Sequence, residues 1–364
     1  MKIIIDGREL RTSTGRYIER LLHYLQAIDT KNQYTVLLKP QDMIGWKPTS
    51  PNFTVLASPF KEFTFGEQLG FRRQLKRLKG DLVHFGMVQQ PILYKGKVVT
   101  TIHDLTTARF RNPDKNIIVF KIKQLVYKIV IRRAAKKSAA IIVPSEYVKN
   151  DVAAFTGVNP NKITVTYESA DPILDNPEPL TELIGKRFLM YVGRPTPHKN
   201  LPRLINAHQA LLAKYPDLIL VLAGKIDNNY RRIQDSVKTH DQQNIIFTDF
   251  VSEGQLRWLY EHCAAYVFPS LSEGFGLPGL EAMLHGAPVV SSNATCLPEI
   301  YGSSARYFDP HMTHSITMTI DLVLSDADVR ATLIANGRDH VKQFSWQRMA
   351  EQTLSVYETA YRSI

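Results

Sequence analysis

Two acidic residues stand beside a glycine-rich turn in the segment AAYVFPSLSEGFGLPGLEAMLHGAPVV, residues 264–290. A buried strand is expected to run into the turn, and a helix to follow it with Pro278 near its first position. The backbone amides of Phe275, Gly276 and Leu277 would then face an anion at the helix N-terminus, where the helix dipole favours negative charge. The pattern predicts a phosphate-binding turn.

Glu273 lies in this loop, and Glu281 is expected in the first helical turn. Carboxylates that flank a diphosphate suit the hydroxyl groups of a sugar or a ribose, which donate hydrogen bonds to them. Alternatively, Glu281 complements the helix dipole and Glu273 caps the helix. The neighbouring glycines and Pro278 favour the ligand-binding interpretation.

Positive charge comes from a second loop. The strand RFLMYVG ends at Gly193, and Arg194 and Lys199 follow in RPTPHKN, before a helix that Asn200 is expected to cap. A guanidinium and an ammonium at one strand end can neutralise a diphosphate in the ground state and as it leaves. Two basic residues in a loop are often merely solvated. Their place at a strand end, in the same half as the phosphate-binding turn, favours a role in binding.

The first half of the chain carries a weaker pattern. STGRY follows the strand KIIID, and Gly15 permits close backbone approach to a ligand, with Arg16 and Tyr17 opening the next helix. No G-x-G-x-x-G motif indicates a nicotinamide or flavin site. The strand KVVTTIH ends at His103, next to Asp104, where a structural hydrogen bond is the simpler interpretation.

Strand-like and helical segments alternate along the whole chain, which predicts an α/β protein with doubly wound parallel sheets. A linker rich in proline and acidic residues runs from 171 to 185. We expect an N-terminal Rossmann-like domain over 1–175 and a C-terminal Rossmann-like domain over 186–345. The last segment, 346–364, has a helical pattern and could pack back on the N-terminal domain.

Composition limits the cellular setting. The chain has 364 residues, of which 44% are hydrophobic, enough for two ordinary cores. Its two cysteines, Cys263 and Cys296, are far apart, so neither a disulfide framework nor a zinc ribbon is expected. The start, MKIIIDGREL, does not resemble a signal peptide, and no apolar run reaches membrane-spanning length. We therefore expect a cytoplasmic protein.

The net charge of +11 is uneven. Residues 1–175 contain 28 Lys and Arg against 15 Asp and Glu, a net +13, whereas 176–364 contain 17 against 19, a net −2. The two halves are therefore expected to meet different partners, or the first half alone to meet an anionic one. Nucleic acid is not expected, because the basic stretches lack interleaved aromatic residues.

Taken together, STGRY, IHDL, VPSEYVKND, YVGRPTPHKNL, EGFGLPGLE and PVVSSNATCLPE resemble the retaining glycosyltransferases of family 4, also called glycosyltransferase group 1. The resemblance covers residues 1 to about 360 in order. It implies the GT-B fold, in which two Rossmann-like doubly wound domains face each other across a cleft. It also implies that the domain over 1–175 binds the acceptor and that the domain over 186–345 binds the nucleotide-sugar donor. The chain is similar in particular to bacterial polysaccharide mannosyltransferases.

The resemblance also implies roles for single residues. Glu273 should contact the transferred sugar, Glu281 the ribose, and His103 should line the reaction centre. Arg194 and Lys199 should bind the diphosphate with help from backbone at Gly15, Gly276 and Leu277. The residues expected to contact substrate without a catalytic role are Gly15, Arg16, Tyr17, Asp104, Asp249, Phe250, Val251, Phe275, Gly276, Leu277 and Glu281; the segment from Asp249 to Val251 should flank the base.

The expected activity is retaining transfer of a sugar from a nucleotide-sugar donor to a glycan or lipid-linked acceptor in cell-surface polysaccharide synthesis. Mannose from GDP-mannose is the preferred donor. No metal or other cofactor is expected, because no D-x-D motif or histidine cluster is apparent. The alternatives are a UDP- or dTDP-sugar-dependent transferase of the same fold, or a non-catalytic nucleotide-sugar-binding or nucleic-acid-binding protein.

A basic stretch over 115–137, KNIIVFKIKQLVYKIVIRRAAKK, and another over 71–80, FRRQLKRLKG, supply the charge of the first half. Helical periodicity places Ile118, Leu125 and Ile129 on more than one face, so most apolar residues of the first stretch are expected in the core. The excess charge leads to the hypothesis of reversible docking on an anionic cytoplasmic membrane surface.

Overall fold

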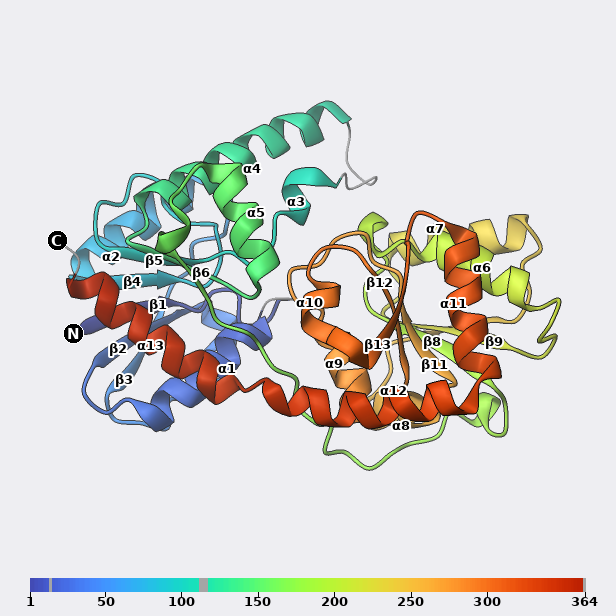
Figure 1. Cartoon of the computed structure of the whole chain (residues 1–364). Helices are drawn as coiled ribbons and strands as arrows, with labels where there is room; N and C mark the ends of the chain where they lie inside the picture. The colour runs from blue at the N-terminus through green and yellow to red at the C-terminus, as the bar shows by residue number, and fades with distance from the viewer. Residues whose placement is uncertain (13–14, 111–116, 363–364) are drawn as a thin grey trace. The chain divides into compact units, whose positions relative to one another are not determined.

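The computed structural model describes residues 1–12, 15–110 and 117–362, without the side chains of 117–119. Two compact units are present (Figure 1). Unit 1 contains Met1–Ala108, Lys121–Glu168 and Ser345–Ile364, and unit 2 contains Arg109–Phe120 and Ser169–Phe344. Unit 1 is therefore completed by a segment that follows unit 2 in the sequence.

Within the described residues, unit 1 is built on a seven-stranded sheet in the order β3-β2-β1-β4-β5-β6-β7, and all neighbouring strands are parallel. Its strands are β1 (Lys2–Asp6), β2 (Gln33–Leu38), β3 (Phe53–Ala57), β4 (Leu82–Phe85), β5 (Val98–Thr101), β6 (Ala140–Val143) and β7 (Ile163–Val165). The helices of this part of the chain are α1 (Gly15–Ile28), α2 (Arg72–Leu78), α3 (Thr106–Arg109), α4 (Ile117–Lys137), α5 (Glu146–Thr156) and α13 (Trp346–Arg362).

The described residues of unit 2 form a six-stranded parallel sheet in the order β10-β9-β8-β11-β12-β13. Its strands are β8 (Phe188–Val192), β9 (Ile219–Ala223), β10 (Ile245–Asp249), β11 (Ala265–Phe268), β12 (Val289–Ser292) and β13 (Ala305–Phe308). Its helices are α6 (Leu201–Leu211), α7 (Asn228–Thr239), α8 (Glu253–His262), α9 (Leu277–Leu284), α10 (Leu297–Tyr301), α11 (Thr313–Ser325) and α12 (Ala327–His340).

Both sheets have the Rossmann strand order, in which the chain starts in the middle, runs to one edge, and then returns to build the other half. The order reverses between β1 and β4 in unit 1 and between β8 and β11 in unit 2. Ligands of such sheets bind beside this reversal, at the carboxyl ends of the strands. The prediction of doubly wound α/β architecture is confirmed.

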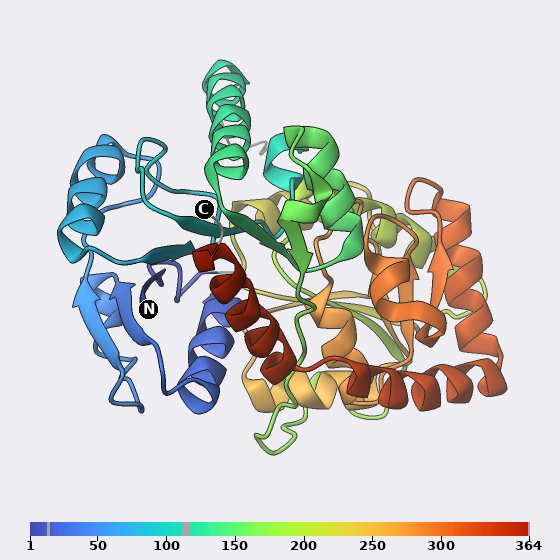
Figure 2. The same cartoon turned by 60° about the vertical axis from the view of Figure 1, so that its left-hand side comes forward.

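The sheets are buried on both faces, as the apolar strand sequences require. In unit 1, α13 packs against α1 and reaches β5 and β6, and Figures 1 and 2 show the two helices side by side. Among the described residues, no helix is both long and apolar enough to cross a lipid bilayer.

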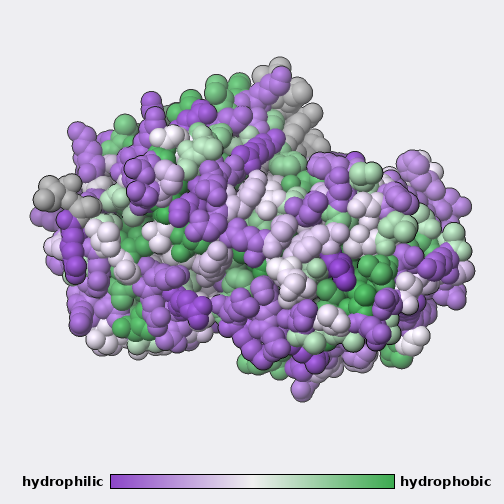
Figure 3. All heavy atoms as spheres, in the orientation of Figure 1, coloured by the Kyte–Doolittle hydropathy of each residue, from purple (hydrophilic) through white to green (hydrophobic). Residues whose placement is uncertain are grey.

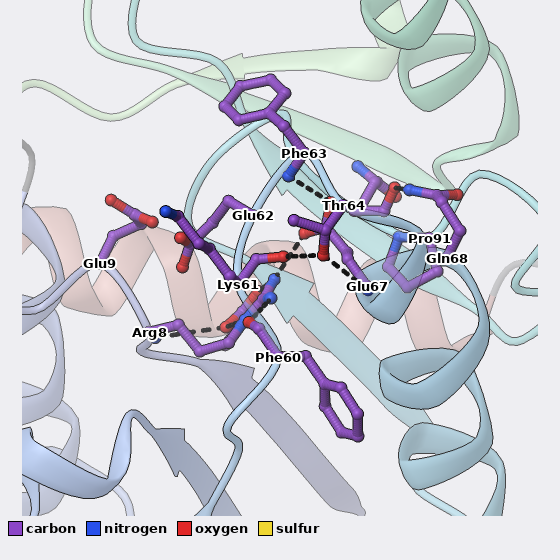
Figure 4. Close-up of polar contacts among 12 residues, drawn as sticks. Arg8, Glu9, Phe60, Lys61, Glu62, Phe63, Thr64, Glu67, Gln68 and Pro91 are labelled. Atoms are coloured by element: carbon purple, nitrogen blue, oxygen red, sulfur yellow. Dashed lines mark hydrogen bonds and ion pairs between the residues drawn. The ribbon is translucent and has the colours of Figure 1, made fainter.

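A buried guanidinium fixes the chain just after β1. Arg8, only 1% exposed, forms two hydrogen bonds of 2.8 Å with Asp6 and one of 3.0 Å with Glu67 (Figure 4). Its remaining nitrogen donates to the carbonyl oxygen of Phe60 at 2.9 Å, and its plane lies 3.9 Å from the Phe71 ring. Loss of one partner from such a buried network typically costs about 3 to 5 kcal/mol. The loops after β1 and β3 are thereby tied together.

Candidate functional site

The loops beside the strand-order reversal of unit 2 bring Lys199 and Glu273 together. Lys199 follows β8 and Glu273 follows β11, and the Lys199 Nζ donates to Glu273 Oε1 at 2.5 Å. Their side chains are only 18% and 13% exposed, and the ammonium lies 5.2 Å from the centre of the Phe268 ring. An ammonium has three donors, of which this contact takes one. Two predicted site residues from distant segments thus meet at the expected edge.

Arg194, on the same loop as Lys199, is much more open. Its side chain is 72% exposed, and its Nε donates to Asp227 Oδ2 at 2.9 Å. Burial pushes the pKa of Asp227 up, but the bonds from Arg194 and from the first amides of α7 outweigh it, so the pKa is lowered. Asp227 remains an anion that orients the guanidinium at the end of β8.

The predicted capping role of Asn200 is wrong. Asn200 has φ 59°, in the left-handed region, and its side-chain oxygen accepts no hydrogen bond from a backbone amide of α6. That oxygen accepts a hydrogen bond of 3.2 Å from the Arg203 guanidinium. A capping side chain needs an extended backbone, which the preceding turn Pro197–Lys199 does not leave. Asn200 Nδ2 instead donates to the carbonyl oxygens of Pro269 at 3.1 Å and Pro310 at 2.8 Å. It fixes the Lys199 turn to the ends of β11 and β13.

The predicted phosphate-binding turn lies at the start of α9. Gly276 has φ 96°, and a Cβ there would come within 2.5 Å of the Tyr301 hydroxyl, which donates to the Gly276 carbonyl at 2.6 Å. Glycine is therefore required on both conformational and steric grounds. Phe275 is buried, with its ring edge-on to Phe344. The helix begins at Leu277, so its first amides follow directly on the turn.

Glu281 does not lie in the first turn of this helix, contrary to expectation. Because α9 begins at Leu277, two residues before the expected GLEAMLHG segment, the first turn contains no acidic residue. Glu281 is 8% exposed, and the Tyr260 hydroxyl donates to its Oε2 at 3.4 Å. The explanation that it complements the helix dipole therefore loses its basis.

The segment from Asp249 to Val251 follows the end of β10. Asp249 has φ 60°, and its Oδ1 accepts a hydrogen bond of 2.8 Å from the backbone of Ile226. Phe250 is 80% exposed, although large apolar side chains are usually covered. Asp249 shapes the loop, and Phe250 offers an open aromatic face at the same carboxyl edge of the sheet as Arg194.

In unit 1, the loop after β1 ends at Gly15, the first residue of α1. A Cβ at Gly15 would lie 2.0 Å from the carbonyl oxygen of Leu10, so only glycine fits. Arg16 is exposed, whereas Tyr17 is 2% exposed and its ring packs edge-on to His103 at 4.9 Å. Of the predicted STGRY motif, residues 13 and 14 lie outside the described residues. Tyr17 is placed to support His103.

His103 is held between two acceptors. Its Nδ1 lies 3.2 Å from Glu168 Oε1, and its Nε2 lies 3.0 Å from the carbonyl oxygen of Gly86. Burial alone would lower the pKa of His103, but the bond to Glu168 outweighs it and the pKa is raised. Since both ring nitrogens can donate only in the imidazolium, this geometry favours the charged form. Asp104 accepts a hydrogen bond from the backbone of Thr106 at 2.8 Å.

Glu168 was not among the predicted site residues. It comes three residues after the end of β7, at the carboxyl edge that also carries His103. The available signal was a carboxylate shortly after a strand, in the segment YES. That signal is weak on its own, because YES precedes an acidic linker and does not resemble a motif.

A buried polar chain leads from the C-terminal helix to this histidine. Tyr357 on α13 lies 2.6 Å from His84 Nδ1, and His84 Nε2 lies 2.9 Å from the Thr101 hydroxyl. The Thr101 hydroxyl is in turn 2.9 Å from that of Tyr17. Burial and the nearby His103 lower the pKa of His84 to about 3, so His84 is neutral and relays one hydrogen bond in each direction.

Across residues 1–12, 15–110 and 117–362, no three His, Cys, Asp or Glu side chains gather where they could hold a metal ion. Cys263 and Cys296 are both free and buried.

Two protein-family models match successive parts of the chain. Residues 14–172 match the model described as Glycosyltransferase Family 4, and residues 175–340 match the model described as Glycosyl transferases group 1. The chain belongs to the family 4 glycosyltransferases. The first match contains His103 and Glu168, and the second contains Arg194, Lys199 and Glu273.

Curated relatives of this glycosyltransferase include several mannosyltransferases. O-antigen chain mannosyltransferase B of Escherichia coli is 29% identical over 283 residues, which are 72% of this chain and 70% of the relative. Serotype-specific mannosyltransferase WbdA of E. coli is 34% identical over 183 residues, 48% of this chain but only 22% of WbdA. The MMP alpha-(1->4)-mannosyltransferase of Mycolicibacterium hassiacum is 29% identical over 63% of this chain and 56% of the relative.

Solved structures agree on the fold. Sucrose-phosphate synthase from Thermosynechococcus elongatus has a TM-score of 0.78 at 18% identity, covering 98% of each chain. Anabaena HepE in complex with UDP and glucose has a TM-score of 0.74 at 16% identity, covering 98% of this chain and 99% of HepE. The glycosyltransferase therefore has the GT-B fold.

The first testable consequence concerns His103. Because its pKa is raised above the ordinary 6.5, the pair with Glu168 stabilises the folded state fully below that value and loses its effect as pH rises through the folded pKa. Glu168→Gln should lower the His103 pKa measured by NMR. It should also reduce the free energy of unfolding by about 1.5 to 3 kcal/mol near pH 6, and by less near pH 9.

Glu146→Gln provides the control, since Glu146 is 51% exposed and pairs only loosely with Lys149 at 3.5 Å. A His103 pKa that is the same in the Glu168 variant and in the wild type would contradict the assignment of this pair.

Proposed function

We propose that this glycosyltransferase moves mannose from GDP-mannose to a glycan or lipid-linked acceptor in polysaccharide synthesis, with retention of the anomeric configuration. The mannosyltransferase relatives support the sugar. The observation that carries the proposal is the pairing of Lys199 with Glu273, beside the N-terminus of α9 and at the strand-order reversal of unit 2. It puts a cation for phosphate next to a carboxylate for sugar hydroxyls.

In this proposal the donor diphosphate contacts Lys199 and Arg194 and the backbone amides of Gly276 and Leu277. Negative charge grows on the diphosphate as its bond to the sugar breaks, and preplaced cations and amides stabilise that charge. The same phosphate takes the acceptor's proton, so no side-chain base is required. Cationic side chains thereby fill the role that a divalent metal would otherwise have.

Glu273 accepts hydrogen bonds from the sugar, and Glu281 accepts them from the ribose. The buried position of Glu281, held by Tyr260, fits a carboxylate that is oriented before a ligand arrives. Phe250 is proposed to stack on the base, because its exposed ring lies at the carboxyl end of β10. Asp249 and Val251 set the position of that ring.

On unit 1, His103 lines the reaction centre as an imidazolium held by Glu168. Gly15 brings backbone close to the phosphates, while the exposed Arg16 adds positive charge beside it. Asp104 keeps α3 and the loop after β5 in place through its bond to Thr106.

The direct experiment is a donor panel. GDP should raise the melting temperature of the purified protein more than UDP, dTDP or ADP, because a ligand that binds only the native state stabilises it. GDP-mannose turnover should release GDP, persist in chelator, and give a product with the donor's anomeric configuration by NMR. Turnover of UDP-glucose alone, an inverted product, or loss of activity in chelator would each overturn the corresponding part of the proposal.

Mutation should distinguish the roles of Glu273 and Glu281. Glu273→Ala should lower kcat by at least about 10²-fold while GDP still binds, since it removes a contact to the sugar and not to the nucleotide. Glu281→Ala should weaken GDP itself in titration calorimetry. Glu253→Ala, an exposed carboxylate on α8, is the matched control. Equal GDP affinity in the Glu273 and Glu281 variants would show that these roles are wrongly assigned.

We further propose that unit 1 docks on an anionic membrane surface through α4. The expectation that most apolar residues of this helix lie in the core is wrong for four of them. Ile122, Leu125, Val126 and Ile129, spaced as one helical stripe, are 41 to 61% exposed. Tyr127 and Ile131 supply the buried face instead. Tertiary packing decided which of two apolar faces turned inward, which periodicity alone did not reveal.

Cations surround this stripe. Lys121, Lys123, Arg132, Arg133 and Lys136 are exposed, and Figure 3 shows hydrophilic and hydrophobic atoms side by side along α4. Lys137 is different, because burial lowers its pKa to about 8 and its Nζ donates to the carbonyl oxygen of Pro91 at 2.8 Å. Exposed apolar side chains bordered by cations suit the interface of an anionic leaflet.

Co-sedimentation with vesicles tests this docking. The protein should bind phosphatidylglycerol vesicles at low salt and release them at high salt, while phosphatidylcholine vesicles bind weakly. Leu125→Asp should abolish binding, and Arg133→Gln should weaken it about fivefold, since one cation near the surface contributes about 1 kcal/mol. Met318→Asp, on the exposed face of α11 in unit 2, is the control. Negligible binding to both kinds of vesicle would refute docking.

A further inference from the structure

A groove of about 480 Å³ runs along unit 1 between α4 and the loops after β3 and β4. Its volume falls in the range of small-molecule pockets. Five apolar side chains line it: Phe63, Phe65, Ile92, Val126 and Val130. The surface that they expose is almost entirely carbon. Phe63 and Phe65 are 64% and 87% exposed, a cost in water that a covering ligand would remove.

The groove is held open by hydrogen bonds on its loop side. Gln68 donates to the carbonyl oxygen of Gln90 at 3.2 Å and accepts from the backbone of Ile92 at 3.0 Å. Glu67 accepts from the backbone of Phe63 at 3.1 Å, and Figure 4 shows the Phe63 ring directed away from the Arg8–Glu67 contact. The walls are therefore set by contacts made among themselves, and the groove is preformed.

The floor contains Gln89 and Gln90, which are 8% and 0% exposed. The side-chain oxygen of each is buried and has no hydrogen-bond partner among the described residues. Since neither oxygen is accessible, the two glutamines offer the groove no side-chain acceptor. Such a lining suits a hydrocarbon chain better than a sugar, whose hydroxyl groups need accessible acceptors.

Helix α4, which forms one wall of the groove, carries a positively charged residue at each end of its apolar part. Lys123, Val126, Val130 and Arg133 follow one another at spacings of three and four, so they share a face of α4. Val126 belongs both to the groove and to the exposed stripe, which makes the two surfaces continuous. Cations that border an apolar groove fit an amphipathic anion, a phosphate carried on a long hydrocarbon chain.

One lining residue of the groove is close in sequence to the proposed reaction centre of unit 1. Gln89 lies three residues after Gly86, whose carbonyl oxygen is 3.0 Å from His103 Nε2. We propose that the groove binds the hydrocarbon chain of a phosphate-bearing lipid that carries the acceptor glycan. This assignment rests on the lipid-linked acceptor of the proposed function, and it names the part of the acceptor that unit 1 recognises.

Titration calorimetry with monomeric alkyl phosphates tests the groove without membranes or turnover. Hexyl, octyl, decyl and dodecyl phosphate should bind in increasing order, with Kd falling about three- to fourfold for each CH₂ that the groove buries. Methyl phosphate should not bind measurably. Val130→Phe, which fills the groove, and Phe65→Ser, at a fully accessible position, should each weaken dodecyl phosphate at least tenfold.

Two variants serve as matched controls. Leu125→Asp, on the stripe but outside the groove, should lose vesicle docking and keep dodecyl phosphate binding. Gln89→Leu should keep or improve binding, because it replaces a buried unpartnered amide with carbon. Dodecyl phosphate that binds Val130→Phe as tightly as wild type would overturn the groove assignment. Binding of methyl α-mannoside to the wild type but not to Gln89→Leu would also overturn the assignment, since that would indicate a sugar subsite.

The failure of this assignment and the failure of the proposed donor can be distinguished by these measurements. Alkyl phosphate binding without GDP-mannose turnover would keep the groove and reject the donor. Turnover of GDP-mannose and vesicle docking without alkyl phosphate binding would keep the donor and reject the groove assignment.

Discussion

Parallel strands all end at the same edge of their sheet, and this constraint assembles the candidate site from segments that are far apart in sequence. Arg194 and Lys199 follow β8, Glu273 follows β11, and Asp249 ends β10. In unit 1, His103 follows β5 and Glu168 follows β7. The sheet itself brings the starting points of these loops together, because neighbouring parallel strands end at the same edge. What remains for local sequence is the shape of each loop.

That shape requires glycine at particular points. Gly193 and Gly224 have φ values of 140° and 149°, and a Cβ on Gly224 would approach the Gly193 carbonyl oxygen to 2.6 Å. Buried charge then fixes the side chains, as in the pairs of His103 with Glu168 and of Lys199 with Glu273. Each pair is largely removed from water, so its geometry must be satisfied for burial to be tolerated. The site therefore has little freedom before it meets any substrate.

Sequence alone predicted the fold because the strands are short, apolar and regularly separated by helices. It also predicted the glycine turn before α9, since Gly276 and Pro278 mark a strand-to-helix turn directly; phosphate binding by this turn stays a prediction. It failed where tertiary contacts override local signals. Asn200 is of a residue type that often caps helices, but its side chain donates to the carbonyl oxygens of Pro269 and Pro310. Glu168 is not part of a recognisable sequence motif. The outward face of α4 depends on what its other face packs against.

Unit 1 depends on helix α13, which follows the whole of unit 2 in the sequence. Tyr357 bonds His84 in the middle of the sheet, and α13 packs along α1. A chain emerging from the ribosome thus exposes the α1 surface and the His84 ring until about residue 362 has been made. Unit 2, apart from the short segment Arg109–Phe120, lies between these two parts of unit 1 and is synthesised whole before α13. During translation, unit 2 should therefore be able to fold first, and unit 1 should close only after α13 has been made.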